Sequence, residues 1–535
     1  MTNNAEENVS SKLSEALWGH RFTAGQKGTD YTLEFMNVLL GANYKLESDY
    51  YVKKKMLLFR QFIFEGYKSG NKKDSHVNFS EEKYQELMEG LNCNVAEVED
   101  IRSFFRNMTI RKSAKDNRSW YAHMLFPLNE TLLFFELRDD KGSIQYERNF
   151  FSRGGELYHL MLSYGTRDSE NLRLSLEQRL REYTKGNENI GNLVKAVSTS
   201  LGESCELEPE DPKNVFLTVP AEKVTQDVPK TNAKNAPTLP VDNLPIYTQF
   251  AEDLHALLGL KIDSYEMFEL MTALICHQLY RYLLGQSANV INEKPYFVLD
   301  CMNGEDTHIK RIASNSYKRH VQIIQESFAT SIKERVDNSL PDVSVIANWK
   351  SEAAKVDNTD INKKYQVFFA DINQASRRAP IKNTLIDKLE NEDEQQALTL
   401  LRMELETLYL AEIKEKQQPI IRTLGEDGGF LTPGNYKRYV MGDTLLNALV
   451  YAVLDEREQM SFADFLSALY ERYHIVIGPT EATVSGVYEK EGINRKSYDA
   501  NEKRLRARLK RNGLLQEYSD ATALVCNPYK VGRFM

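Results

Sequence analysis

A cluster of prolines is the strongest constraint on how this 535-residue chain folds. Seven of its fifteen prolines lie between Cys205 and Pro245. Proline fixes the backbone angle φ and lacks an amide hydrogen, so a segment this rich in proline forms no long helix. We expect residues 205–245 to be an extended, proline-rich linker, with Val215–Val219 as a candidate edge strand. A chain of this length also exceeds what one core usually holds, and we expect two to four domains.

The part before the linker, residues 1–204, combines helical and strand patterns. Three segments repeat apolar residues with the period of a helix: Tyr31–Leu40, Glu81–Leu91 and Gly154–Ser163. Thr131–Leu137 is dominated by leucine and phenylalanine, and Ser143–Phe151 alternates after a glycine-containing turn, as a returning strand does. We therefore expect an α+β N-terminal domain with a β-hairpin near residues 131–151.

Helical periodicity dominates the middle region, residues 246–440. Four segments show it: Leu254–Leu258, Tyr265–Leu284, Ile309–Asp337 and Asp387–Lys416. The last segment surrounds its leucines with charges, which suits either an exposed arm or half of a helical hairpin. Tyr296–Cys301 is a short apolar run that ends in Met-Asn-Gly, the pattern of a strand followed by a turn.

The last unit, residues 441–535, orders its elements differently. Asp443–Glu456 has helical spacing, and Ser461 opens a second helix that ends near Tyr473. A basic helix and two short strands follow at Asn494–Gly513, Leu514–Tyr518 and Ala523–Cys526. Helix, turn, helix and a β-hairpin is the order of a winged-helix domain, which we expect here.

The basic helix carries the clearest chemical signal of the sequence. From Gly486 to Gly513, nine Lys or Arg residues face four Asp or Glu residues, although the whole chain has a net charge of −9. One side of this helix is suited to docking and holds Tyr498, Asn501, Leu505 and Leu509. The remaining cations suit contact with phosphates, which supplies affinity without reading sequence. The residues that we predict to contact nucleic acid are Arg495, Lys496, Lys503, Arg504, Arg506, Arg508, Lys510 and Arg511.

Composition restricts where such a contact lies. The sequence pI of about 5.7 excludes a protein that coats nucleic acid with its whole surface, so we expect a local contact. The first residues are polar, and the longest apolar runs, Met56–Phe64 and Phe268–Leu284, contain charged residues. The five cysteines are scattered and form no CxxC pair. These features predict a cytoplasmic protein without membrane contact.

The segment Trp18–Gln26 places a His20–Arg21 pair between aromatic residues and before a glycine. Such a segment either forms a ligand-binding corner or packs as a structural corner. The second interpretation is the commoner one, with Trp18 and Phe22 buried and Arg21 paired with an acid such as Glu34.

Phe151–Tyr158 has the sequence Phe-Ser-Arg-Gly-Gly-Glu-Leu-Tyr. Gly154 and Gly155 precede a helix, so their amides are placed to bind an anion beside Arg153. The simpler hypothesis is a turn into the helix, with Glu156 in its first turn.

No catalytic signature occurs in the sequence. The nine histidines lack HExxH spacing, adjacent Cys276 and His277 point apart on a helix, and GxxxxGK[ST], GxSxG and kinase motifs are missing. We expect no metal, no cofactor and no activity of its own. The nearest alternative is a divergent metal-dependent nuclease built on Glu136, Arg138 and Asp116.

Three groups of residues together resemble uncharacterised subunits encoded in multi-gene bacterial anti-phage defence operons. They are Trp18–Phe22 with Gly25–Gln26 and Leu33–Phe35, then Phe151–Tyr158, and finally Tyr473–Gly478 with Asn501, Leu505, Leu509, Gly513–Leu515 and Ser519–Asp520. The resemblance implies a bacterial cytoplasmic protein that depends on partner subunits, and it implies no particular activity.

We thus expect a mainly helical protein that acts as a non-catalytic, DNA-engaging adaptor of a phage-defence complex. Other chains of the complex would supply an ATPase or nuclease. A pure protein–protein scaffold without nucleic-acid binding is the first alternative, and the divergent nuclease is the second.

Overall fold

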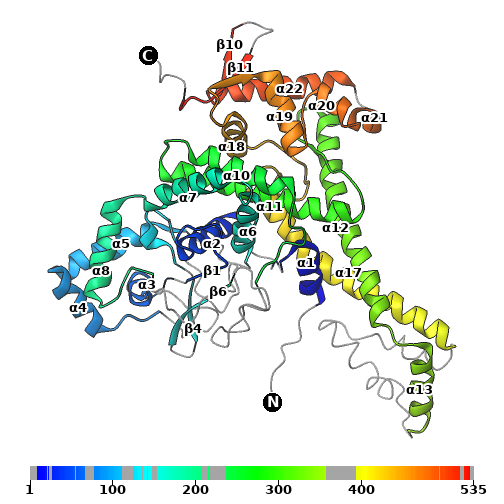
Figure 1. The fold of residues 1–535 in the computed structure, drawn as a ribbon, viewed down its shortest axis with the longest axis horizontal. Helices are drawn as coiled ribbons and strands as arrows, with labels where there is room; N and C mark the ends of the chain where they lie inside the picture. The colour runs from blue at the N-terminus through cyan, green and yellow to red at the C-terminus, as the bar shows by residue number, and fades with distance from the viewer. Residues whose placement is uncertain are drawn as a thin grey trace.

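The computed structural model shows a helical body, a long helical arm and a smaller C-terminal unit (Figure 1). It describes residues 9–20, 22, 27–52, 54, 56–66, 77–110, 124–134, 136–140, 143–147, 153–207, 215–216, 236–356, 393–492, 494–518 and 523–530. The protein is mainly helical, as predicted. Within the described ranges, no helix combines the length and apolar character that crossing a membrane requires.

The N-terminal body consists of helices joined by very short strand pairs. Its helices are α1 (Val9–Trp18), α2 (Gly28–Gly41), α3 (Leu57–Phe64), α4 (Glu81–Leu91), α5 (Val95–Asn107), α6 (Gly154–Gly165), α7 (Glu170–Lys185) and α8 (Glu188–Ser200). Its antiparallel pairs are β1 (Tyr50–Tyr51) with β6 (Val215–Phe216), β2 (Thr109–Ile110) with β3 (Met124–Leu125), and β4 (Glu136–Asp140) with β5 (Ser143–Glu147). The three helices predicted here are all confirmed, and the expected edge strand at Val215 does pair with β1.

The predicted hairpin forms, but its first strand is shorter than the sequence indicated. Glu130–Leu132 is a 3-10 turn, η1, and the strand begins only at Glu136. The turn is stabilised by Asn129, whose side chain accepts the Thr131 amide hydrogen at 3.0 Å. Leu132, Leu133 and Phe134 are buried without belonging to a strand. The apolar residues of this run are therefore buried, but the strand predicted over Thr131–Leu137 is wrong for its first half.

Long helices form the middle of the molecule. They are α10 (Pro245–Leu258), α11 (Ser264–Val290), α12 (Thr307–Ser339), α13 (Val343–Ala354) and α17 (Glu394–Asp427). Pro245, the last proline of the predicted linker, occupies the first turn of α10, where a missing amide hydrogen costs nothing. Most of α11 is buried, because α2, α10, α12, α17 and the later helix α18 (Asp443–Leu454) all pack around it. α10 also packs on α6 and α7 of the N-terminal body.

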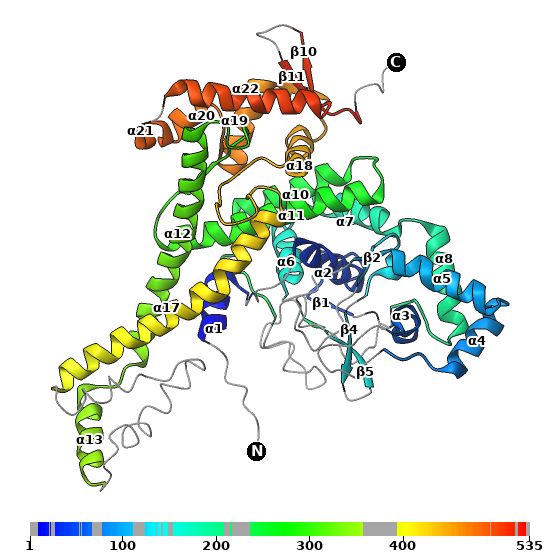
Figure 2. The same ribbon diagram turned by 180° about the vertical axis from the view of Figure 1, so that it is seen from behind.

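The arm is formed by α12, α13 and α17, which run side by side away from the body in both views (Figures 1 and 2). The predicted segment Asp387–Lys416 is a helix from Glu394 onward, and its first residues, 387–392, lie outside the described part. The helix continues to Asp427 through Pro419, which corrects its expected end. A proline inside a helix costs about 3 kcal/mol. Burial of Ile420, Ile421 and Leu424 offsets that cost.

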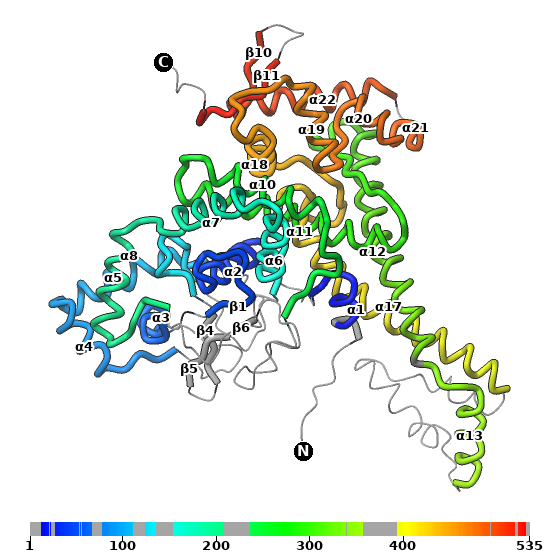
Figure 3. The backbone as a smooth tube through the Cα atoms, in the orientation of Figure 1, coloured from blue at the N-terminus to red at the C-terminus, as the bar shows by residue number. Residues whose placement is uncertain are grey.

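The C-terminal unit lies at the end of the molecule opposite the arm's tip, as the backbone trace shows (Figure 3). Its elements are α18 (Asp443–Leu454), β8 (Gln459–Ser461), α19 (Phe462–Tyr473), β9 (Ile475–Val476), α20 (Pro479–Val484), α21 (Val487–Glu491), α22 (Arg495–Arg511), β10 (Leu515–Glu517) and β11 (Ala523–Cys526). The two predicted strands pair, and β8 adds a third antiparallel strand beside β11. Neither β8 nor the short helices α20 and α21 were expected.

A two-stranded parallel sheet joins this unit to the middle of the molecule. β7 (Phe297–Val298), within the strand predicted at Tyr296–Cys301, pairs with β9 through Phe297 and Ile475. Because each strand has only two residues, side-chain contacts carry most of this junction. α22 contacts α12 nearby, so the basic helix is anchored on the long helices.

Candidate nucleic-acid interface

Local signals fix both ends of α22. The Asn494 side chain accepts the Lys496 amide hydrogen at 2.9 Å, which caps the first turn. After the last turn, Gly513 adopts a φ of +73°, a conformation that glycine tolerates best. Arg508, Lys510 and Arg511 occupy that last turn, where positive charge favours the helix dipole. The predicted helix is therefore confirmed.

One face of α22 is buried, and it is the face that the periodicity predicted. Tyr498, Asn501, Leu505 and Leu509 have no exposed surface. Asn501 makes three buried hydrogen bonds: its Oδ1 accepts from the Cys301 amide at 2.8 Å, and its Nδ2 donates to the carbonyls of Leu299 and Ile477 at 2.9 and 3.1 Å. Since those carbonyls follow β7 and β9, this side chain positions the helix on the parallel sheet.

The opposite face of α22 is open to solvent and carries a stripe of three lysines, Lys496, Lys503 and Lys510. A seven-residue spacing is nearly two helical turns, so the three side chains point the same way. Lys496 and Lys503 make no ion pair with any described residue. Both side chains are exposed, so their ammonium groups are accessible to an external anion.

Three acidic residues hold the flanks of the helix. Arg504 pairs with Glu305 at 2.7 Å. Arg508 and Arg511 both pair with Asp443, at 2.5 and 3.1 Å. Arg506 and Lys510 share Glu517 on the other flank, at 2.9 and 2.5 Å. Arg495 makes only a long contact of 3.9 Å with Asp499.

The two arginines that pair with Asp443 differ in how firmly they are held. Only 11% of the Arg508 side chain is exposed, so this residue mainly ties α22 to the first turn of α18. Burial acts to raise the pKa of Asp443, but the hydrogen bonds and charge of Arg508, together with Asn512 and Arg511, outweigh it and the pKa is lowered. The Arg511 side chain is 66% exposed and can turn toward another anion at little cost.

The Trp18 corner is packed, as its simpler interpretation held. Trp18 and Phe22 are buried, the Trp18 indole nitrogen donates to Ser287 Oγ at 3.2 Å, and His20 stacks on Phe22. Arg21 lies outside the described residues. The corner thus joins the N-terminal helix to α11.

The amide that the glycine pair offers is used within the protein. Gly155 N–H donates to Glu34 Oε2 at 2.6 Å, and Arg153 pairs with Glu156 at 2.7 Å. A side chain at Gly155 would meet the Phe35 amide nitrogen at 2.3 Å, so the glycine allows α6 to approach α2. The Gly155 amide is thus occupied by a carboxylate of the chain itself, and Glu156 lies in the first turn of α6, as the simpler hypothesis held.

The acids of the nuclease hypothesis lie mostly outside the described part. This holds for Asp116 and for the side chains of Glu136 and Arg138. Among the residues that are described, no three His, Cys, Asp or Glu side chains group as a metal site. Cys276 and His277 diverge as expected, since Cys276 lies beside Gly28 and His277 contacts Phe430.

One pair that the sequence did not single out resembles a nucleophile and its base. Ser175 Oγ lies 2.7 Å from His255 Nε2. Arg179 donates to His255 Nδ1 at 3.3 Å and to its carbonyl at 2.6 Å. Because Nδ1 accepts, Nε2 carries the hydrogen and donates to Ser175, so the ring is in the wrong tautomer to deprotonate the serine.

No family model and no curated protein matches the chain. The residues and their geometry therefore carry the functional argument alone.

Proposed function

We propose that this protein is a non-catalytic, DNA-engaging subunit of a bacterial multi-protein complex that serves in phage defence. The observation that carries the proposal is α22, a helix docked through one face that presents Lys496, Lys503 and Lys510 along the other. These three lysines span about 21 Å, or about six base-pair steps along a duplex. Contacts of this kind bind the phosphate backbone of any sequence.

The order of elements in the C-terminal unit supports the same proposal. Helix α18, strand β8 and helix α19 are followed, after two short helices, by α22 and the β10–β11 hairpin. The sheet order β10–β11–β8 places the first strand beside the last. We assign this arrangement to a winged helix in which α22 holds the position of the recognition helix.

The test is a mobility shift of duplex DNA by the full-length chain at 50 and 200 mM salt. Wild-type binding should weaken steeply with salt, and replacing Lys496, Lys503 and Lys510 by Ala should lower the salt slope by about 0.9 for each phosphate that the helix no longer neutralises. A matched control replaces the exposed lysines Lys185, Lys261 and Lys333 and should bind as wild type does. Wild-type protein without salt-sensitive binding, or an α22 variant with unchanged binding, rules the proposal out.

A pure scaffold remains the second candidate, because the arm exposes apolar side chains. On α17, Met403 and Leu410 are 60% and 37% exposed and lie seven residues apart on one face. Replacing both by Ser should abolish co-purification with proteins encoded by adjacent genes if the arm binds a subunit. That result together with absent DNA binding favours the scaffold.

A further inference from the structure

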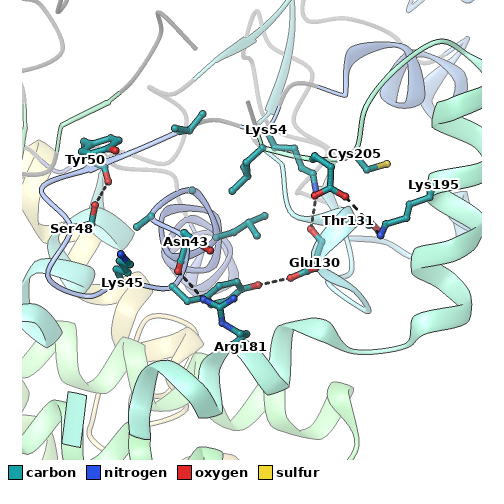
Figure 4. A pocket seen from close by; sticks show the side chains of 17 residues that line it. Asn43, Lys45, Ser48, Tyr50, Lys54, Glu130, Thr131, Arg181, Lys195 and Cys205 are labelled. Carbon is teal, nitrogen blue, oxygen red and sulfur yellow. Dashed lines mark hydrogen bonds and ion pairs between the residues drawn. The ribbon is translucent and has the colours of Figure 1, made fainter. Parts of the chain in front are cut away.

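A cavity of about 520 Å³ lies in the N-terminal body, far from α22 (Figure 4). Its wall is built by the end of α2, the segment that leads through β1 to Lys54, the turn η1, and the helices α7 and α8. The volume falls within the range of small-molecule sites in proteins and far exceeds a single phosphate ion. These segments are distant in the sequence, so only the fold brings them together.

Lys54 is the most unusual residue of this cavity. It is 5% exposed, and its ammonium group donates to the Glu130 carbonyl at 3.1 Å. It makes no ion pair with a carboxylate in the described part of the chain. Burying a charged ammonium group is costly unless an anion compensates it. A buried cation that opens on a cavity therefore points to an anionic occupant.

Three further cations line the same cavity: Lys45, Arg181 and Lys195. The guanidinium of Arg181 lies 4.6 Å from the centre of the Tyr44 ring and donates to the Asn43 carbonyl at 3.0 Å. Both contacts fix its plane, which suits it to bind an oxyanion through its remaining N–H groups. Figure 4 shows Lys54 and Lys195 on one side of the cavity and Arg181 with Lys45 on the other.

The acids of the cavity do not neutralise these four cations. Glu130 accepts from the Tyr44 hydroxyl at 2.9 Å, and Glu206 lies 3.9 Å from Lys195. The carbonyl end of α2 adds about half a negative charge. Among the described residues of the lining, four cations against two carboxylates and this half charge leave a positive balance.

The rest of the lining indicates what else the occupant contains. Leu40, Gly41, Ala42 and Val52 supply apolar surface, and the ring of Tyr50, 44% exposed, lies at the cavity. An inorganic anion alone would leave this surface empty. We propose that the cavity binds a small organic phosphate, with Lys54 contacting its phosphate and Arg181 contacting the molecule from the other side of the cavity. This site is independent of the DNA-binding face proposed for α22.

The test is isothermal titration of the full-length chain with ribose 5-phosphate, inorganic phosphate and ribose at constant ionic strength. Wild-type protein should bind ribose 5-phosphate more tightly than inorganic phosphate, and it should not bind ribose. Lys54→Met keeps the side-chain length without the charge and should weaken binding at least about tenfold. Lys185→Met, on the same helix as Arg181 but outside the cavity, should bind as wild type does.

Arg181→Gln provides a second variant, at a side chain that is exposed to solvent. It should also weaken ribose 5-phosphate binding, by several-fold or more. Wild-type protein that binds none of the three probes overturns the proposal, and so does wild-type affinity in Lys54→Met. Binding of inorganic phosphate without ribose 5-phosphate overturns the assignment to an organic phosphate.

Discussion

The exposed face of α22 and the cavity around Lys54 both concentrate positive charge, yet their surroundings are opposite. On α22, the lysines are exposed to water and Arg504 pairs with Glu305 at the surface, so an exposed charge there contributes little to folding. In the cavity, Lys54 is shielded from water and has a carbonyl as its hydrogen-bond partner. A lysine therefore has little effect on the free energy of unfolding on α22, whereas a buried lysine in the cavity lowers it.

This difference shows which observation indicates a ligand. A surplus of charge on a solvated helix is compatible with solubility alone, so only a binding experiment can show that it marks a binding site. A buried cation is retained at the expense of stability, so it calls for an explanation in the folded structure. Measurements of stability can therefore test the two regions against each other.

The largest effect is expected where α22 docks. Asn501→Ala leaves the Cys301 amide and the Leu299 and Ile477 carbonyls buried without this partner, which should destabilise the C-terminal unit by about 3 kcal/mol. Urea denaturation followed by circular dichroism measures the change, and hydrogen exchange locates it.

A matched control for Asn501 is Asn289→Ala, which makes the same substitution at an exposed position in the last turn of α11. It should change stability by less than about 0.5 kcal/mol. Equal urea midpoints for both variants would show that the docked face is not held by Asn501.

The second-largest effect concerns Lys54, whose removal should raise the stability of the protein. Burial lowers the pKa of Lys54 to about 8, and Cys205, Glu130 and Glu206 offset only part of this shift while Lys195 adds to it. The unfolded lysine keeps its proton to about pH 10.5, so the unfolded state binds more protons between pH 8 and pH 10.5. The burial cost is therefore complete below pH 8 and fades as pH rises through that window.

Lys54→Met should consequently be more stable than wild type by about 1–3 kcal/mol at pH 7 in phosphate-free buffer. The advantage should shrink toward pH 10, as thermal or urea unfolding at several pH values can measure. Lys185→Met, at an exposed position, should show no such trend. A Lys54→Met variant less stable than wild type at pH 7 would contradict the buried-charge account.

The smallest effects concern the flanks of α22. Arg508→Ala should cost about 1 kcal/mol, since this mostly covered side chain joins α22 to Asp443. Arg511→Ala, at the same acid but 66% exposed, should cost less than about 0.5 kcal/mol. Urea midpoints of the two variants give the comparison. Equal destabilisation would mean that exposure does not distinguish the two pairs.

Several elements were predictable because their signal is local. The helical period located α4 to the residue, and the basic helix predicted at Asn494–Gly513 begins at Arg495. The docked face of α22 was correct because apolar spacing within one helix directly reports burial. The end of α17 was not predictable from local signals, because packing of its last turns outweighs the cost of Pro419. The three-part division of the chain and the eight basic contact residues stay predictions.

The sequence by itself determined several of the helices, the proline-rich segment and the basic character of residues 495–511, all of which depend on neighbours within a few positions. Only the tertiary structure decided which cations are free to bind. It joined Arg508 to Asp443, 65 positions away, and enclosed Lys54 between η1, α7 and α8. The reason is physical: a charge acquires its energy from its surroundings, and those surroundings come from residues that no local pattern relates.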